Sequence, residues 1–129
     1  GRWGVGSDSH ATVNAAEELM LLEYSQRLAM RQRNVLASDA HAFVATATTL
    51  AAVAGGAQAS GRAVAGLAAG QQADLVVLNA AHPLLHELPT PDAMLSAHVF
   101  ASHRTSAATA CGHCGCPTGT YTVRSTGCA

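Results

Sequence analysis

The chain has 129 residues, enough for one hydrophobic core, and a formal net charge of −1, which excludes a strongly basic protein of the kind that binds nucleic acids. No apolar run reaches the about 20 residues that a membrane-spanning helix needs, and no secretory leader opens the sequence. These features predict a cytoplasmic protein without nucleic-acid or membrane partners.

A short Gly/Val stretch, Gly4 to Gly6, opens the sequence and is followed by Ser7, Asp8 and His10. We expect this stretch to be a strand. In a (β/α) barrel the chemistry lies at the C-terminal ends of the strands, so Asp8 is the first candidate site residue. Its carboxylate has three possible roles: binding a metal, acting as a base, or capping the next turn. The residues alone leave these roles open, and capping is the commonest of them.

The next segment predicts a helix from Asn14 to Asn34. Asn14 and Glu17 have the spacing of a capping box, so the helix should begin there. Glu23 and Arg27 lie four residues apart and are expected to pair on the side away from the core. The side chains expected to face the core recur every three or four residues, at Leu19, Leu21, Leu22, Tyr24 and Leu28.

A second helix is predicted from about Asp39, with Asp39 or Ser38 as its cap, to a C-terminal stop at Gly61. Gly55 and Gly56 should weaken its middle or end its first part. A strand is predicted at 73–78, because β-branched residues are enriched there. After a proline-rich loop at 79–91, Asp92 should cap a short helix that runs to Phe100. The histidines of these segments lack metal-ligand spacing and are expected on the surface or in loops: His41, His82, His86, His98 and His103.

Two separated segments, 56–61 and 66–78, resemble the C-terminal passage of the amidohydrolase superfamily. The resemblance implies an α/β fold, namely the C-terminal part of a (β/α)8 barrel (its last strand and helices) plus part of a small β-sandwich domain. The corresponding domains are 1–65 for the barrel part and 66–104 for the sandwich part with a short helix. An irregular, cysteine-containing tail is expected at 105–129.

More narrowly, the opening stretch and the helix after it resemble the formimidoylglutamate deiminases, from about Gly4 to Arg104. This resemblance implies that Gly4 to Gly6 is the eighth barrel strand and that Asp8 is both a Zn²⁺ ligand and a catalytic residue. The other zinc ligands, all histidines, would lie outside this chain. Ser7 and His10 flank Asp8 and are weaker candidates for substrate binding.

The function that this resemblance implies is zinc-dependent hydrolysis of N-formimino-L-glutamate, a small-molecule substrate, to N-formyl-L-glutamate and ammonia. The full-length enzyme is expected to be a homodimer, and the present chain alone to be inactive. One alternative is another deaminase or hydrolase of the superfamily that acts on C–N bonds.

A second alternative is a small zinc-binding interaction module, because thiolates that lie close together can chelate zinc. All four cysteines fall in the last nineteen positions, at Cys111, Cys114, Cys116 and Cys128. The same cluster also fits a different hypothesis, out-of-frame translation of Cys111 to Ala129. The absence of acidic residues after Asp92 and the loss of hydrophobic periodicity favour this hypothesis.

Overall fold

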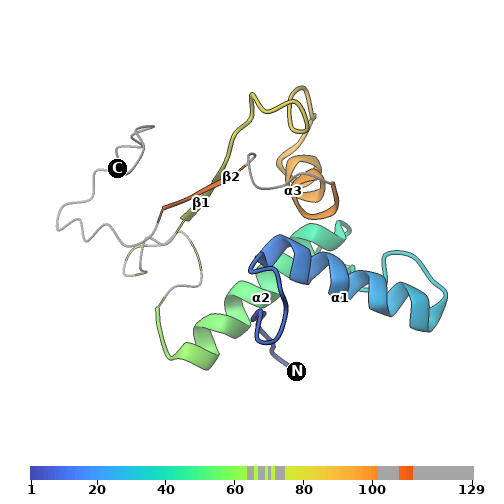
Figure 1. The fold of residues 1–129 in the computed structure, drawn as a ribbon, viewed down its shortest axis with the longest axis vertical. Coiled ribbons are helices and arrows are strands. Elements are labelled where there is room, and N and C mark those ends of the chain that lie inside the picture. The colour runs from blue at the N-terminus through green and yellow to red at the C-terminus, as the bar shows by residue number, and fades with distance from the viewer. Residues whose placement is uncertain (64–65, 67–68, 70, 72–74, 102–107, 112–129) are drawn as a thin grey trace.

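The computed structural model describes residues 1–63, 66, 69, 71, 75–101 and 108–111. Three helices pack against one another, and a pair of strands lies to one side of them (Figure 1). The described part of the chain is thus a mixed α and β structure in which helices dominate, and no helix in it is both long and apolar enough to span a bilayer. The elements in chain order are α1 (Ala15–Met30), α2 (Val44–Ser60), β1 (Leu75–Leu78), α3 (Pro91–Phe100) and β2 (Ala108–Cys111).

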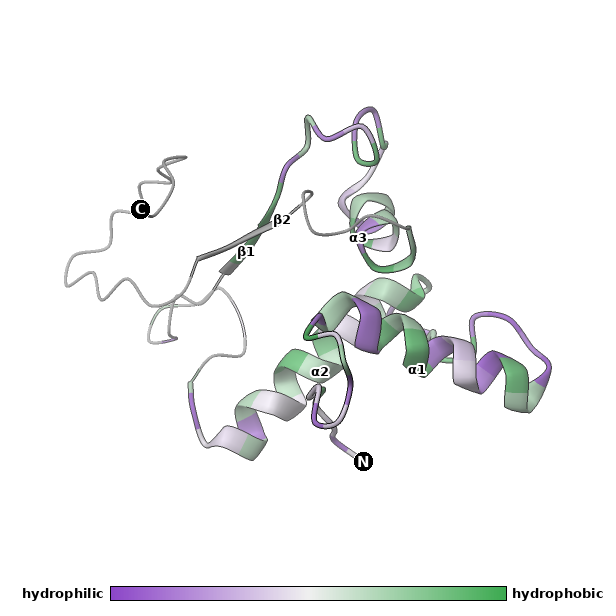
Figure 2. Cartoon of the chain, viewed as in Figure 1, coloured by the Kyte–Doolittle hydropathy of each residue, from purple (hydrophilic) through white to green (hydrophobic). Residues whose placement is uncertain are grey.

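The hydrophobic core lies where the three helices meet. Small side chains of α2 allow the close approach, and Figure 2 shows that most of α2 is apolar or neutral whereas hydrophilic and hydrophobic residues alternate along α1. Trp3, which precedes α1, packs against the same cluster. The buried residues of the cluster are Ala16, Leu19, Ala45, Ala52 and Val99.

The predicted start of the first helix is confirmed. The Asn14 side-chain oxygen accepts hydrogen bonds from the amides of Ala16, at 3.0 Å, and Glu17, at 3.4 Å. Because these amides have no partner within the helix, the cap satisfies them. The helix ends earlier than predicted, at Met30, where Arg31 takes the left-handed conformation (φ 53°).

The buried face of α1 differs from the predicted one. Leu19 is buried, but Leu21, Tyr24 and Leu28 are 45%, 40% and 81% exposed. The buried positions of the helix are Ala16, Leu19 and Glu23. They also recur every three or four residues, but on a different face of the helix from the predicted one. The expectation that Glu23 lies away from the core is therefore wrong. Its carboxylate can be buried because Arg27 and two backbone amides donate hydrogen bonds to it, which offsets the cost of removing the charge from water.

The second helix begins at Val44, five residues later than predicted. Phe43 is its N-cap residue and supplies no side-chain hydrogen bond. Ser38 and His41 instead exchange backbone hydrogen bonds of 3.0 Å in both directions. This turn holds Asp39 at its tip, so neither Ser38 nor Asp39 can cap the helix. The predicted stop at Gly61 is confirmed, with φ 65° and hydrogen bonds from Gly61 and the next residue back to the last turn.

The two middle glycines of α2 do not interrupt it. A Cβ atom added at Gly55 would lie 1.8 Å from the Trp3 carbonyl oxygen, and one added at Gly4 would lie 3.2 Å from Gly56 Cα. The N-terminal segment therefore crosses α2 with the two backbones in contact. The prediction of a strand at Gly4 to Gly6 is wrong, because among the described residues no backbone group pairs with this stretch.

The predicted strand is confirmed as β1, while positions 73 and 74 lie outside the described residues. β1 pairs with β2 in an antiparallel register that places Leu75 opposite Cys111 and Leu78 opposite Ala108. The expectation of an irregular tail is therefore wrong for Ala108–Cys111, whose backbone pairs with one edge of β1 in a two-stranded sheet. The rest of the tail, including the other three cysteines, lies outside the described residues.

The short helix α3 is capped by Thr90 and not by Asp92. The Thr90 hydroxyl accepts a hydrogen bond of 3.1 Å from the Ala93 amide, and Pro91 occupies the first helical position, where its missing N–H costs nothing. Asp92 instead accepts a hydrogen bond from the Thr46 hydroxyl and so links α3 to α2. Of the predicted surface histidines, His41 and His86 are exposed, His82 and His98 are half-buried, and His103 lies outside the described residues.

Candidate functional site

The three predicted site residues lie on one turn that precedes α1. The His10 amide donates a hydrogen bond of 2.6 Å to the Ser7 carbonyl oxygen, which closes the turn. Asp8 has a positive φ of 35° and is exposed at the tip. In the described part of the chain its carboxylate has no hydrogen-bond or ion-pair partner. Asp8 therefore caps no helix here, and its carboxylate is free to contact a ligand.

His10 is tied to α1 by a residue that the sequence did not single out. Its Nδ1 atom lies 2.6 Å from Oε1 of Glu18. The Glu18 side chain is 12% exposed and that of His10 is 51% exposed, so the carboxylate is the inner member of the pair. The capping-box pattern drew attention to Glu17 instead. The sequence feature that could have indicated a role for Glu18 is its position in the first turn of the helix, directly after the turn that carries His10.

A pocket of about 380 Å³ lies beside this turn. It is formed by the N-terminal segment, by α1 and by the connection after α1. Glu18 lines it, whereas Ser7, Asp8 and His10 do not. Glu18 therefore joins the pocket to the turn of candidate residues. The residues that line the pocket are Trp3, Gly4, Val5, Gly6, Glu18, Leu22 and Leu36.

The described residues offer part of a metal site at most. No group of three or more histidine, cysteine, aspartate or glutamate side chains gathers among them in a way that could hold a metal ion. Among the described residues Asp8, Glu17 and Asp39 present carboxylates without a hydrogen-bond or ion-pair partner, and of these only Asp8 lies on the turn of candidate site residues. Carboxylate oxygen is a ligand that Zn²⁺ accepts. The donor chemistry of Asp8 thus fits zinc, provided that ligands from outside the chain complete the site.

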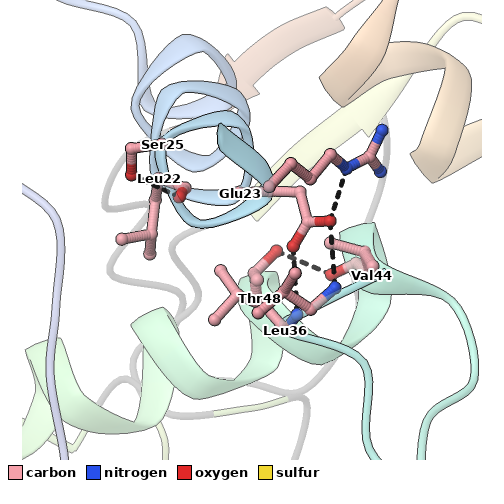
Figure 3. Close-up of polar contacts among 8 residues, drawn as sticks. Leu22, Glu23, Ser25, Leu36, Val44 and Thr48 are labelled. Carbon is pink, nitrogen blue, oxygen red and sulfur yellow. Dashed lines mark hydrogen bonds and ion pairs between the residues drawn. The ribbon is translucent and has the colours of Figure 1, made fainter. Parts of the chain in front are cut away.

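Glu23 is the other carboxylate whose position the sequence did not predict, and its contacts are structural. Its side chain is 0% exposed, and it accepts hydrogen bonds from Arg27 Nε at 2.6 Å and from the amides of Val35 and Leu36 at 3.2 Å and 3.0 Å (Figure 3). The guanidinium of Arg27 also lies 5.3 Å from the ring centre of Tyr24. Because every contact goes to the protein itself, Glu23 holds the connection after α1 and has no free oxygen directed at a ligand.

Comparison with known proteins shows what this chain is similar to in sequence. No family model matches the chain. Among curated proteins it is similar to a deiminase, as the opening stretch and first helix predict. The relative is the formimidoylglutamate deiminase of Pseudomonas aeruginosa (strain PAO1), with 46% identity over 101 residues, which make up 78% of this chain. The chain spans 22% of the length of that relative. The predicted resemblance is thereby confirmed for a fragment of such an enzyme.

Proposed function

We propose that the chain is part of a zinc-dependent deiminase that converts N-formimino-L-glutamate and water to N-formyl-L-glutamate and ammonia in histidine degradation. The observation that carries this proposal is the 46% identity to formimidoylglutamate deiminase over 101 residues. The free carboxylate of Asp8 beside a pocket supports it, because the reaction needs a group that can accept and return a proton.

The fold of the complete enzyme is part of the same proposal. Residues 1–65 would belong to a (β/α)8 barrel and residues 66–104 to a small β-sandwich domain. The exposed apolar side chains of α1 support this assignment, because helices that cover a barrel are apolar on the side that faces it. A cytoplasmic homodimer with a small-molecule substrate completes the proposal.

Asp8 would hold the zinc ion together with histidines from outside this chain. When bound, zinc supplies Lewis-acid chemistry that makes water reactive at neutral pH. The Asp8 carboxylate accepts a proton as water attacks the formimino carbon. It then returns the proton to the departing nitrogen, which leaves as ammonia. Ser7 and His10, on the same turn, would contact the substrate.

The test is the Asp8→Asn substitution in the full-length protein. The amide keeps the shape of the side chain but loses its charge and basicity, so the rate of ammonia release should fall by about 10²–10⁴-fold. Zinc content should fall as well, because a neutral amide is a poorer ligand. Asp39→Asn is the matched control, since Asp39 is also an exposed acid in a turn. Normal turnover and normal zinc content in Asp8→Asn would refute the assigned roles of Asp8.

A further inference from the structure

The turn that carries Asp8 is attached to α1 by the contact between His10 and Glu18. The 2.6 Å distance between His10 Nδ1 and Glu18 Oε1 is that of a strong, charge-assisted hydrogen bond. Glu18 is well placed to act as an anchor, because its side chain is only 12% exposed and its amide donates the hydrogen bond of 3.1 Å to the Asn14 carbonyl that begins the helix. Glu18 is therefore held within α1, whereas the imidazole ring of His10 lies at the surface.

The chemistry of the contact determines which ring nitrogen is available to a ligand. An ionised carboxylate only accepts hydrogen bonds, so the hydrogen atom lies on Nδ1 of His10. In the neutral ring, Nε2 is then a hydrogen-bond acceptor. Nε2 has no hydrogen-bond partner in the described part of the chain. The contact with Glu18 thus leaves an oriented acceptor on the same turn as the free carboxylate of Asp8.

We propose that Glu18 is a positioning residue, which holds His10 so that Nε2 accepts a hydrogen bond from an N–H group of the substrate. This inference rests on the proposed function, whose substrate carries N–H donors in its formimino group. Two features of Glu18 support it: Glu18 lines the pocket, and it contacts the ring that flanks Asp8. A carboxylate that served only to stabilise the start of α1 would need neither the pocket position nor the contact with His10.

The first experiment reads the tautomer of His10 by ¹⁵N NMR in full-length protein with labelled histidine. The His10 signal is assigned by its absence in His10→Gln. We expect the Nδ1–H form in the unchanged protein and in Glu18→Gln, whose side-chain oxygen still accepts a hydrogen bond. Glu18→Ala should lose this preference. Glu17→Ala is the matched control, because it removes a neighbouring carboxylate of the same helical turn that does not contact His10, and it should leave the signal unchanged.

The second experiment measures the kinetics of ammonia release from N-formimino-L-glutamate for the same variants. Glu18→Ala should lower kcat/KM by about 10–100-fold, by analogy with the loss seen when a carboxylate that orients a metal-bound histidine is removed. Glu18→Gln should restore most of the activity. The double variant Glu18→Ala/His10→Gln should be no worse than His10→Gln, since Glu18 acts through His10.

Additive losses in the double variant, or an unchanged His10 tautomer in Glu18→Ala, would overturn the inference. Failure of the proposed function is seen separately, as full-length protein that folds and binds zinc but releases no ammonia from this substrate. In that case the contact between Nε2 of His10 and the substrate would be refuted together with the proposed function. The NMR result would still decide whether Glu18 positions His10.

Discussion

Gly55 of α2 and Trp3 of the N-terminal segment meet backbone to backbone. A Cβ atom at Gly55 would lie 1.8 Å from the Trp3 carbonyl oxygen and 2.7 Å from its nitrogen. These atoms cannot move aside as the end of a flexible side chain can. The contact fixes where the segment that leads to Asp8 crosses the helix, so the position of the candidate site depends on a glycine far from it in sequence.

Substitution of this glycine should therefore destabilise the full-length protein. We expect Gly55→Ala to lower the free energy of unfolding by about 1–3 kcal/mol, as overpacking does in other cores. Gly56→Ala is the matched control, because a Cβ there meets nothing within 4 Å. It should raise stability by about 0.5–1 kcal/mol, since alanine favours the helix. Denaturant unfolding measures both, and equal effects of the two substitutions would contradict the backbone contact.

Glu23 should matter to stability and not to the chemical step. In Glu23→Ala the amides of Val35 and Leu36 lose their acceptor. A fully buried amide without a partner costs about 1–3 kcal/mol, and because these two amides are part-buried the cost should lie at the lower end of that range for each. The melting temperature should fall, while the KM of the remaining folded enzyme stays unchanged. Glu17→Ala, on the same helix, is the control. A variant with normal stability would show that the connection after α1 is held by other contacts.

The cap of α1 is tested by Asn14→Ala. The substitution removes the acceptor for two first-turn amides and should cost about 0.5–2 kcal/mol of stability. Asn14→Asp keeps an acceptor at the same position and should retain most of the stability. Thermal unfolding of both variants in the full-length protein provides the measurement, and equal melting temperatures for Asn14→Ala and the unchanged protein would exclude the cap.

The isolated chain is expected to fold poorly. Large apolar side chains of α1 remain exposed, among them Leu28 at 81% and Leu21 at 45%, and Val13 before the helix is 86% exposed. Surfaces of this kind favour association over a stable monomer. We expect a broad thermal transition and concentration-dependent association in light scattering. A sharp, cooperative transition of a monomer would contradict this expectation.

Local signals in the sequence predicted the parts of the fold that depend on near neighbours. Asn14 and Gly61 mark helix ends because capping and the left-handed conformation are properties of a few adjacent residues. β1 was predicted for a similar reason, its β-branched residues. Thr90 was missed as a cap because Asp92 is an equally good acceptor by type, and only the actual backbone shows which one faces the free amides.

What the sequence could not show were contacts between distant segments. The close approach of Trp3 and Gly55 joins positions fifty-two residues apart, and nothing local to either indicates it. The burial of Glu23 was missed because hydrophobic periodicity counts a carboxylate as a surface residue. For the candidate site, Ser7, Asp8 and His10 were predicted as a group and do share one turn, but their link to Glu18 required the structure.

The hydrogen bonds of Glu23 also bear on the order in which the chain folds. They join residues 12 and 13 positions apart, and a loop of this length closes within about 10–100 ns, far faster than distant segments meet. Once α1 has formed, the connection at Val35 and Leu36 can therefore return to it before α2 docks. We expect α1 and this connection to form an early folding unit, onto which α2 and then the crossing at Trp3 are added.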